Sequence, residues 1–232
     1  MTLAPSVVVH TLSGDQFVTD LFRANKEVLI FSWNGERVVP GRIRIEAPRL
    51  SVPLKLELDD GSWILASGTS RFLLHSGGDE TLRELPTKTS LLPLYLRRDH
   101  QGYAAYREPG LFHRDALTSS DRRNWRKVSR MVAEWKLGRR MQPGDFVRYK
   151  DGDRGNSDPF NLEIEFIKPK ARRSQKSKFA EPIFAAHDFI KKVNHKVEDV
   201  KVGTSREMFS IKGIGISNFA VGGVFVSVDV EV

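Results

Sequence analysis

The sequence predicts a mainly β protein in which a small α/β segment interrupts a β-rich body built from both chain ends. Short segments of alternating polarity, separated by turn residues, dominate the outer parts of the chain. The charge is also uneven, because residues 101–195 hold 21 Lys/Arg and 12 Asp/Glu, whereas the rest of the chain holds 16 and 17. Such an asymmetry is typical of a segment with a separate partner. We therefore divide the chain into residues 1–100, 101–195 and 196–232.

The outer segments alternate between polar and apolar residues, as strands with one buried face do. Asn34 and Gly35 follow the first of them and predict a two-residue hairpin turn, because both residues tolerate positive φ. Asp60 and Gly61 predict a second turn. The predicted strands cover residues 28–33, 42–45, 54–58, 63–65, 197–202, 208–211 and 224–232.

One helix is predicted in the middle segment. Ser119 or Ser120 can cap its first turn with a hydroxyl group. Gly138 predicts its end, since glycine readily adopts the left-handed backbone that terminates helices. The apolar residues that recur at helical spacing are Trp125, Val128, Val132 and Trp135.

The composition excludes several classes of protein. The chain contains no cysteine, which rules out disulfides, Cys-ligated zinc and thiol nucleophiles. It has no apolar run of about 18 residues, so no transmembrane helix is expected, and its first residues lack the features of a signal peptide. Among the six histidines, His187 and His195 lie eight apart, but no carboxylate or third histidine completes a metal site with them. We therefore expect no metal, no cofactor and no membrane partner.

Several segments resemble sequence blocks of the Hint (Hedgehog/intein) family. Residues 11–18, Thr-Leu-Ser-Gly-Asp-Gln-Phe-Val, resemble the Cys-Leu-Ser-Gly-Asp opening of an intein. Residues 58–74 resemble the block that normally ends Thr-x-x-His-x-Phe/Val-Leu. Residues 207–228 resemble the C-terminal end, with Asn218-Phe219 and Gly223-Val-Phe-Val226 in matching register. The resemblance implies a Hint-like β-domain made of both chain ends.

The reactive positions of these blocks hold other residues. Acyl transfer to the Thr11 hydroxyl would need a nearby base and oxyanion donors. Cleavage by asparagine cyclisation would need an amide side chain, which Val228 does not have. The resemblance therefore implies that the splicing chemistry is lost. The substituted positions are Thr11, Ser67, Ser70, Ser217, Ser227 and Val228.

The middle segment resembles an HNH homing-endonuclease module, which inteins commonly carry as an insert. Residues 145–164 resemble the motif Val-His-His-x-Asp-Gly-Asn-x-x-Asn-x-x-Pro-x-Asn-Leu-Glu. Residues 128–133 resemble the upstream His-Arg-Leu-Val-Ala helix, with Ser129 at the His position. The resemblance implies a small ββα-like insert.

The HNH-like motif also lacks its chemical groups. By position, Arg148 stands where a metal ligand should be and Tyr149 where the general base should be. Arginine cannot ligate a cation, and tyrosine is protonated at neutral pH. Asn156 and Asn161 keep the amides of the motif, but two amides do not make a nuclease. The resemblance therefore implies that DNA cleavage is lost.

A basic run without acidic residues follows the HNH-like motif. Its ammonium and guanidinium groups could bind the phosphates of a nucleic acid. The alternative is a solvated loop between two elements, and the sequence leaves both open. The cations of the run are Lys168, Lys170, Arg172, Arg173, Lys176 and Lys178.

Loss of chemistry with retention of fold patterns indicates that the protein uses a surface. Our first hypothesis is a pseudoenzyme that serves as a structural or assembly protein of a bacteriophage, because inteins with HNH inserts abound in phage genomes. Its partners would be other subunits of the phage particle, and it would reside in the virion or the cytoplasm of the bacterial host. The alternative is a DNA-binding protein that keeps the affinity of the insert without cleavage. An active intein or homing endonuclease is the third possibility.

Overall fold

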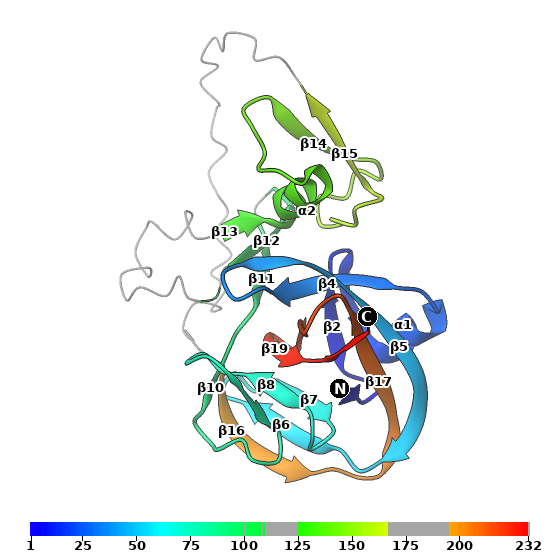
Figure 1. The fold of residues 1–232 in the computed structure, drawn as a ribbon, viewed down its shortest axis with the longest axis vertical. Coiled ribbons are helices and arrows are strands. Elements are labelled where there is room, and N and C mark those ends of the chain that lie inside the picture. The colour runs from blue at the N-terminus through cyan, green and yellow to red at the C-terminus, as the bar shows by residue number, and fades with distance from the viewer. Residues whose placement is uncertain (100, 108, 110–124, 167–194, 232) are drawn as a thin grey trace.

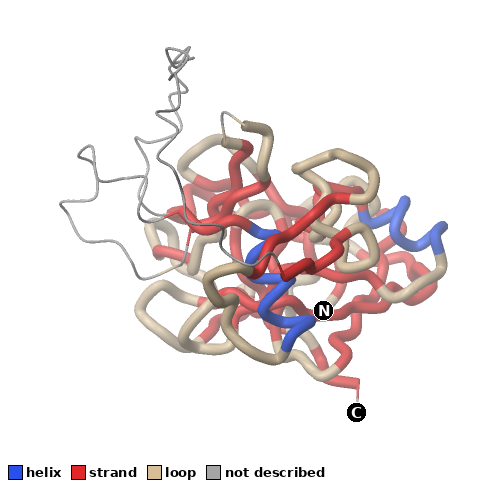
Figure 2. The backbone as a smooth tube through the Cα atoms, turned by 90° about the horizontal axis from the view of Figure 1, so that it is seen from above, coloured by secondary structure: helices blue, strands red, loops and turns tan. Residues whose placement is uncertain are grey.

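The computed structural model describes residues 1–99, 101–107, 109, 125–166 and 195–231. Strands dominate these residues, and one long, curled sheet forms the body of the protein (Figures 1 and 2). The predicted mainly β fold class is therefore confirmed. No helix in the described part of the chain is long and apolar enough to cross a membrane.

The curled sheet draws on both ends of the chain. Its strands are β1 (Thr2–Leu3), β2 (Val8–Thr11), β3 (Gly14–Phe17), β4 (Val28–Trp33), β5 (Val38–Ser51), β6 (Leu54–Leu58), β7 (Trp63–Ala66), β8 (Arg71–Leu73), β9 (Asp79–Thr81), β10 (Ser90–Leu91), β16 (His195–Val202), β17 (Arg206–Ile214), β18 (Asn218–Val221), β19 (Val224–Ser227) and β20 (Asp229–Glu231). They follow the order β10-β16-β6-β7-β1-β17-β5-β4-β2-β18-β19-β8-β9, with β20 on β17 and β3 on β2. Helix α1 (Val18–Ala24) follows β3.

The predicted strand positions agree with the structure in most of the body. Residues 28–33 and 54–58 form β4 and β6 with the predicted bounds. The predicted strand at 42–45 is the middle of the longer β5, and the strand predicted at 224–232 is interrupted at Val228. The turn after β4 differs, because it spans four residues rather than two. Asn34 Oδ1 accepts hydrogen bonds from the backbone N–H groups of Glu36 and Arg37 there, which is the turn chemistry typical of asparagine.

The inside of the curled sheet is an apolar core. Alternating residues of the strands point into it, and its largest side chains include the fully buried Phe72 and Phe219. Burying a phenylalanine side chain stabilises a fold by about 1.5–3 kcal/mol. Polar residues take the opposite face along β5 and β6, as the alternation in the sequence predicts, whereas β18 is buried on both faces.

The middle segment forms a smaller unit beside the body (Figure 1). Three antiparallel strands, β11 (Tyr95–Arg98), β12 (Ala104–Arg107) and β13 (Trp125–Lys127), lead into helix α2 (Val128–Leu137). A hairpin of β14 (Asp145–Tyr149) and β15 (Leu162–Phe166) follows the helix. The predicted division at residues 100 and 195 stays a prediction.

The predicted helix is correct at its C-terminal end and wrong at its N-terminal end. Gly138 has φ +64° and ends α2 as expected. The helix begins only at Val128, because Trp125 and Lys127 pair with β12 as part of β13. Strand pairing therefore overrides the helical spacing of Trp125. Ser119 and Ser120, the predicted caps, lie outside the described residues.

A second apolar cluster joins the small unit to the body. Phe31 of β4 lies 6.4 Å from Tyr106 of β12, measured between ring centroids. Val132 of α2 is fully buried in the same cluster. In addition, the N–H group of Ser157 donates a 3.0 Å hydrogen bond to the carbonyl oxygen of Leu12. The two parts are therefore packed together rather than only tethered.

Candidate functional site

The first candidate site lies where β1 crosses the loop after β7. β1 pairs with β17 on one side and with β7 on the other, with Leu3 opposite Ala66. The carbonyl oxygen of Thr2 accepts hydrogen bonds from the N–H group of Ser67 at 3.0 Å and from the Ser70 hydroxyl at 3.5 Å. The structure therefore brings Ser67 and Ser70 together at Thr2.

Thr11 lies in a different environment. It is the last residue of β2, opposite Gly14 in the β2–β3 hairpin, and its hydroxyl donates to the Gly14 carbonyl oxygen at 2.5 Å. None of its described hydrogen bonds reaches Ser67 or Ser70. The Gly-Asp pair that matched an intein opening instead begins β3, with Gly14 at φ +124° directly after the hairpin turn at Leu12 and Ser13. The structure therefore places Thr2, rather than Thr11, beside Ser67 and Ser70.

The residues near the C-terminus lie next to the start of the chain. Val228 is buried, and its N–H group donates a 2.8 Å hydrogen bond to the carbonyl oxygen of Ser217, which lies at the surface. The next residue, Asp229, begins β20, which runs parallel to β17. The amino nitrogen of Met1 lies 3.4 Å from Asp229 Oδ2. The residue before Thr2 therefore lies next to the residue after Val228.

Ser227 is committed to a hydrogen bond. Its hydroxyl donates to Asp79 Oδ2 at 2.6 Å, while Arg71 Nη2 lies 2.8 Å from Asp79 Oδ1. The Arg71 guanidinium holds the pKa of the Asp79 carboxyl below its usual value, with the Ser227 hydroxyl as a lesser cause, although burial acts in the opposite direction. Asp79 is therefore a stable acceptor at neutral pH rather than a proton donor.

A cavity of about 700 Å³ opens beside Thr2. Its lining includes hydroxyl-bearing and charged residues, namely Thr2, Ser51, Ser67, Ser210, Glu46, Arg49 and Lys212. No imidazole, thiol or amide side chain is among the residues that line it. The cavity therefore offers hydrogen-bond donors and acceptors but no group with a pKa near neutrality.

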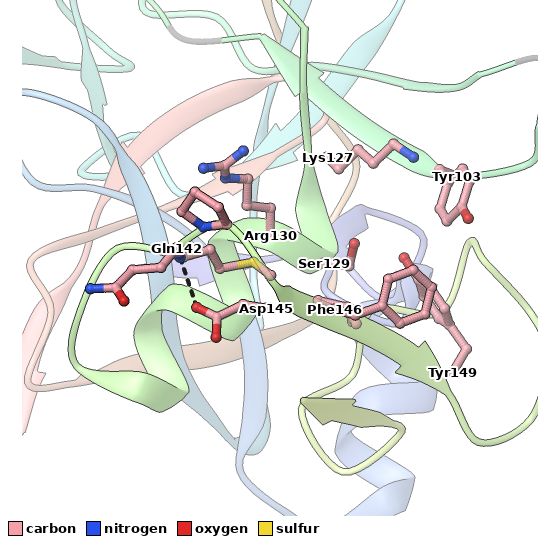
Figure 3. Close-up of a pocket in the computed structure, with 11 residues that line it drawn as sticks. Tyr103, Lys127, Ser129, Arg130, Gln142, Asp145, Phe146 and Tyr149 are labelled. Carbon is pink, nitrogen blue, oxygen red and sulfur yellow. Dashed lines mark hydrogen bonds between the residues drawn. The ribbon is translucent and has the colours of Figure 1, made fainter. Parts of the chain in front are cut away.

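The second candidate site lies between β13, α2 and β14 (Figure 3). This pocket has a volume of about 430 Å³, and Ser129 and Tyr149 both line it. Burial raises the pKa of the Tyr149 phenol, and the nearby hydroxyls of Ser129 and Ser157 offset this only in part. The structure therefore brings Ser129 and Tyr149 together, but the phenol stays protonated at neutral pH and cannot act as a base.

The pocket is also lined by one carboxylate, that of Asp145, which already has a hydrogen-bond partner and an ion-pair partner. Asp145 Oδ2 accepts from the backbone N–H group of Gln142 at 2.7 Å, the dashed line in Figure 3, and lies 2.6 Å from Arg139 Nη1. The Arg139 guanidinium lowers the pKa of the Asp145 carboxyl, with the Gln142 N–H group as a second cause. An ionised carboxylate clamped by a guanidinium is a poor ligand for a catalytic metal ion.

The remaining HNH-like positions have structural contacts. Arg148 is exposed on the other face of β14, where its Nη1 lies 3.6 Å from Glu165. The amide of Asn156 donates to Asp151 Oδ2 at 2.7 Å, and that of Asn161 donates to Asp151 Oδ1 at 2.8 Å. Both amides therefore brace the loop of the β14–β15 hairpin. The cations of the predicted basic run at 168–178 lie outside the described residues.

Comparison with known proteins identifies the fold. No protein-family model and no curated protein sequence matches the chain. The structure is similar to the crystal structure of the Ssp DnaB mini-intein variant M86, with a TM-score of 0.51 and 12% identity over 100% of this chain and 95% of that chain. It is also similar to a DnaB intein from Synechocystis sp., with a TM-score of 0.50 and 12% identity over 99% of each chain. The chain therefore has the Hint fold of inteins.

Proposed function

We propose that this protein is a pseudoenzyme that keeps the Hint fold without splicing chemistry and carries a degenerate HNH-derived insert. In this proposal it serves as a structural or assembly protein of a bacteriophage particle. The observation that carries the loss of chemistry is the hydrogen bonding around the Met1–Thr2 peptide. The carbonyl oxygen of Met1 accepts a 2.8 Å hydrogen bond from the N–H group of Ile211. The donors of Ser67 and Ser70 instead face the carbonyl of Thr2, one peptide further along.

Acyl transfer to the Thr2 hydroxyl would develop negative charge on the Met1 carbonyl oxygen. Oxyanion stabilisation requires donors aimed at that atom and contributes about 3–4 kcal/mol per donor. Here the 67–70 loop does not supply them, and a serine hydroxyl cannot take the place of the imidazole that would move the proton. The same holds at the C-terminal end, where Val228 has no nucleophilic atom.

The fold around these positions nevertheless keeps buried hydrogen bonds, as Asn218 shows. Asn218 is buried, and its side chain bonds both backbone groups of Trp33, accepting from the N–H group at 2.7 Å and donating to the carbonyl at 2.8 Å. A fold that is retained although its reactive residues are substituted supports a structural role. The HNH-like insert supports a phage origin through the resemblance of its motif.

Mass spectrometry of purified virions tests the structural role. A phage whose genome encodes this chain should contain it in its particles at a fixed ratio to the capsid proteins. Presence in infected cells but absence from particles would reject the structural reading. Intact-mass measurements of the isolated protein test the loss of chemistry separately.

DNA binding is the second candidate function, and the small sheet favours it. The register of β11–β13 places Arg97 and Lys127 opposite one another across Ala105, on the face that also carries Trp125. Arg97 stacks over Trp125 at 4.0 Å, and Lys127 Nζ lies 3.3 Å above the ring of Tyr103. Cations interleaved with aromatic rings are typical of surfaces that bind single-stranded nucleic acids. Fluorescence anisotropy with single-stranded and duplex oligonucleotides tests this reading.

A further inference from the structure

Three potential metal ligands meet at the edge of the body. Asp59 and Asp60 form the turn between β6 and β7, and His195 begins β16, which pairs with β6. One ligand atom from each residue lies within 4.8 Å of the other two. His195 Nδ1 and Asp60 Oδ2 are 3.3 Å apart, and His195 is only 8% exposed. The sequence analysis expected no carboxylate beside His195, whereas strand pairing brings two.

The Asp59 carboxylate has an oxygen that a bound cation would satisfy. Its Oδ1 is buried and accepts no hydrogen bond from any described residue. A buried carboxylate oxygen without a partner is costly, since it has lost its hydration without compensation. The Asp60 carboxylate is held in place, because its Oδ1 accepts from the N–H group and the hydroxyl of Ser62 at 2.9 and 2.6 Å. Its Oδ2 is thereby directed toward His195.

The surroundings of the imidazole favour a fixed ring. The ring of Tyr95 stacks on it, with 5.6 Å between centroids and an interplanar angle of 26°. A Cβ atom at residue 223 would lie 3.0 Å from His195 Nε2, so Gly223 leaves the space that the ring occupies. An oriented imidazole loses less entropy when it binds a metal ion.

We propose that Asp59, Asp60 and His195 bind a divalent transition-metal ion, with zinc as the best fit. One imidazole nitrogen and two carboxylate oxygens are donors that zinc accepts in a tetrahedral site. Zinc–ligand distances of about 2.0–2.1 Å place neighbouring ligand atoms about 3.4 Å apart, close to the 3.3 Å between His195 Nδ1 and Asp60 Oδ2. Two carboxylates neutralise the ion, and water takes the fourth position. The site would clamp the β6–β7 turn to the start of β16.

Isothermal titration calorimetry tests the site. The protein, without an affinity tag, is treated with EDTA, dialysed and titrated with zinc chloride at neutral pH. We expect one site per chain, and we expect cobalt(II) to give the visible absorption bands of a tetrahedral ion. Asp59→Asn, Asp60→Asn and His195→Gln should each weaken zinc binding by at least about 100-fold, since even losses outside the ligand set cost about 10–100-fold.

The matched control is His10→Gln. His10 lies 2.7 Å from one carboxylate oxygen of Asp15, and its Nε2 already accepts a hydrogen bond from the N–H group of Gly223. Zinc affinity should be unchanged in this variant. The proposal is wrong if the wild-type protein shows neither zinc heat nor cobalt bands, or if His195→Gln binds zinc as tightly as wild type. Should His195→Gln fail to fold by circular dichroism, Asp60→Asn, on a partly exposed turn, decides the question.

Discussion

The hydroxyl oxygen of Ser70 lies 3.5 Å from the carbonyl oxygen of Thr2, so the loop after β7 reaches the first strand of the protein. This contact places the loop at residues 67–70 one peptide away from the bond that an acyl shift at Thr2 would attack. The arrangement keeps the meeting of the two chain ends, in which Met1 lies next to Asp229. What the site lacks is groups that transfer protons.

The wild-type chain should stay intact. We expect no time-dependent cleavage before Thr2, before Thr11 or after Val228, because none of these positions has both a nucleophile and a general base. Intact-mass spectrometry during prolonged incubation with dithiothreitol or hydroxylamine measures this. A fragment that accumulates from any of the three positions would show that the site retains chemistry.

The HNH-like pocket should be inactive in the wild-type protein, and two substitutions should give it weak nicking activity. The wild-type protein should not nick supercoiled plasmid with magnesium, manganese or zinc. Changing Ser129→His together with Tyr149→His places two imidazoles in the pocket, and we expect the double variant to bind manganese and to nick slowly. Arg148→His is the matched control, since Arg148 faces solvent on the other side of β14 and should change nothing.

Wild-type nicking that disappears on Asn161→Ala would contradict the structural role of that amide. Asn161 braces the hairpin loop through Asp151, so we expect this variant to loosen the loop without any effect on DNA. Limited proteolysis within residues 150–161 would report the loosening.

Asn218→Ala should destabilise the body strongly. The change leaves the N–H and carbonyl groups of Trp33 without their partners in a largely buried setting. We expect a loss of about 2–4 kcal/mol in the free energy of unfolding, because each unsatisfied buried group costs about 1–3 kcal/mol. Urea denaturation measures it. Asn34→Ala, which removes bonds in an exposed turn, should cost about 1 kcal/mol or less, and equal losses would show that burial is not the cause.

The Asp79 ion pair should stabilise the protein in a pH-dependent way. The pKa of Asp79 is lowered by Arg71 and Ser227, so its stabilisation is present above the unfolded-state pKa of about 3.9 and is lost as the pH falls through the folded-state value. Asp79→Asn should therefore lower the urea midpoint at pH 7, and the difference from wild type should shrink below about pH 4.

The control for this measurement is Asp20→Asn. Asp20 is half exposed and lies 3.6 Å from Arg23 in the neighbouring helical turn, so its removal should change the urea midpoint little at either pH. A pH-independent effect of Asp79→Asn would show that shape rather than charge matters at that position.

The strands could be predicted from the sequence because each depends on its own alternation. The bounds of β6 are an example, since Leu54, Leu56 and Leu58 follow the period of two that a half-buried strand requires. The inward position of Tyr149 and the outward position of Arg148 follow from the same period. The start of α2 could not be predicted, because Trp125 pairs with Arg107 as a strand residue, and Arg107 lies 18 residues earlier in the sequence.

The candidate sites were harder to predict because they depend on residues far apart in the sequence. Thr11 matched a motif locally, yet it ends β2 at a hairpin turn, and Thr2 reaches Ser67 only through pairing of β1 with β7. Likewise, Asp60 meets His195 because β16 pairs with β6. The spacing of these residues along the chain therefore does not predict that Thr2 lies near Ser67 or that Asp60 lies near His195.

DNA binding, if it is retained, should depend steeply on salt. Three to five phosphate contacts predict that affinity falls about 40- to 500-fold between 50 and 200 mM salt, from a slope of about −0.9 per contact. Two variants locate the contacts by fluorescence anisotropy. Arg97→Gln with Lys127→Gln removes the cations of the small sheet, and the second variant changes all six cations of the basic run at 168–178 to Gln. Whichever surface binds DNA should flatten the salt slope when it is changed, whereas undetectable binding of the wild-type protein at 50 mM salt would eliminate the DNA-binding function.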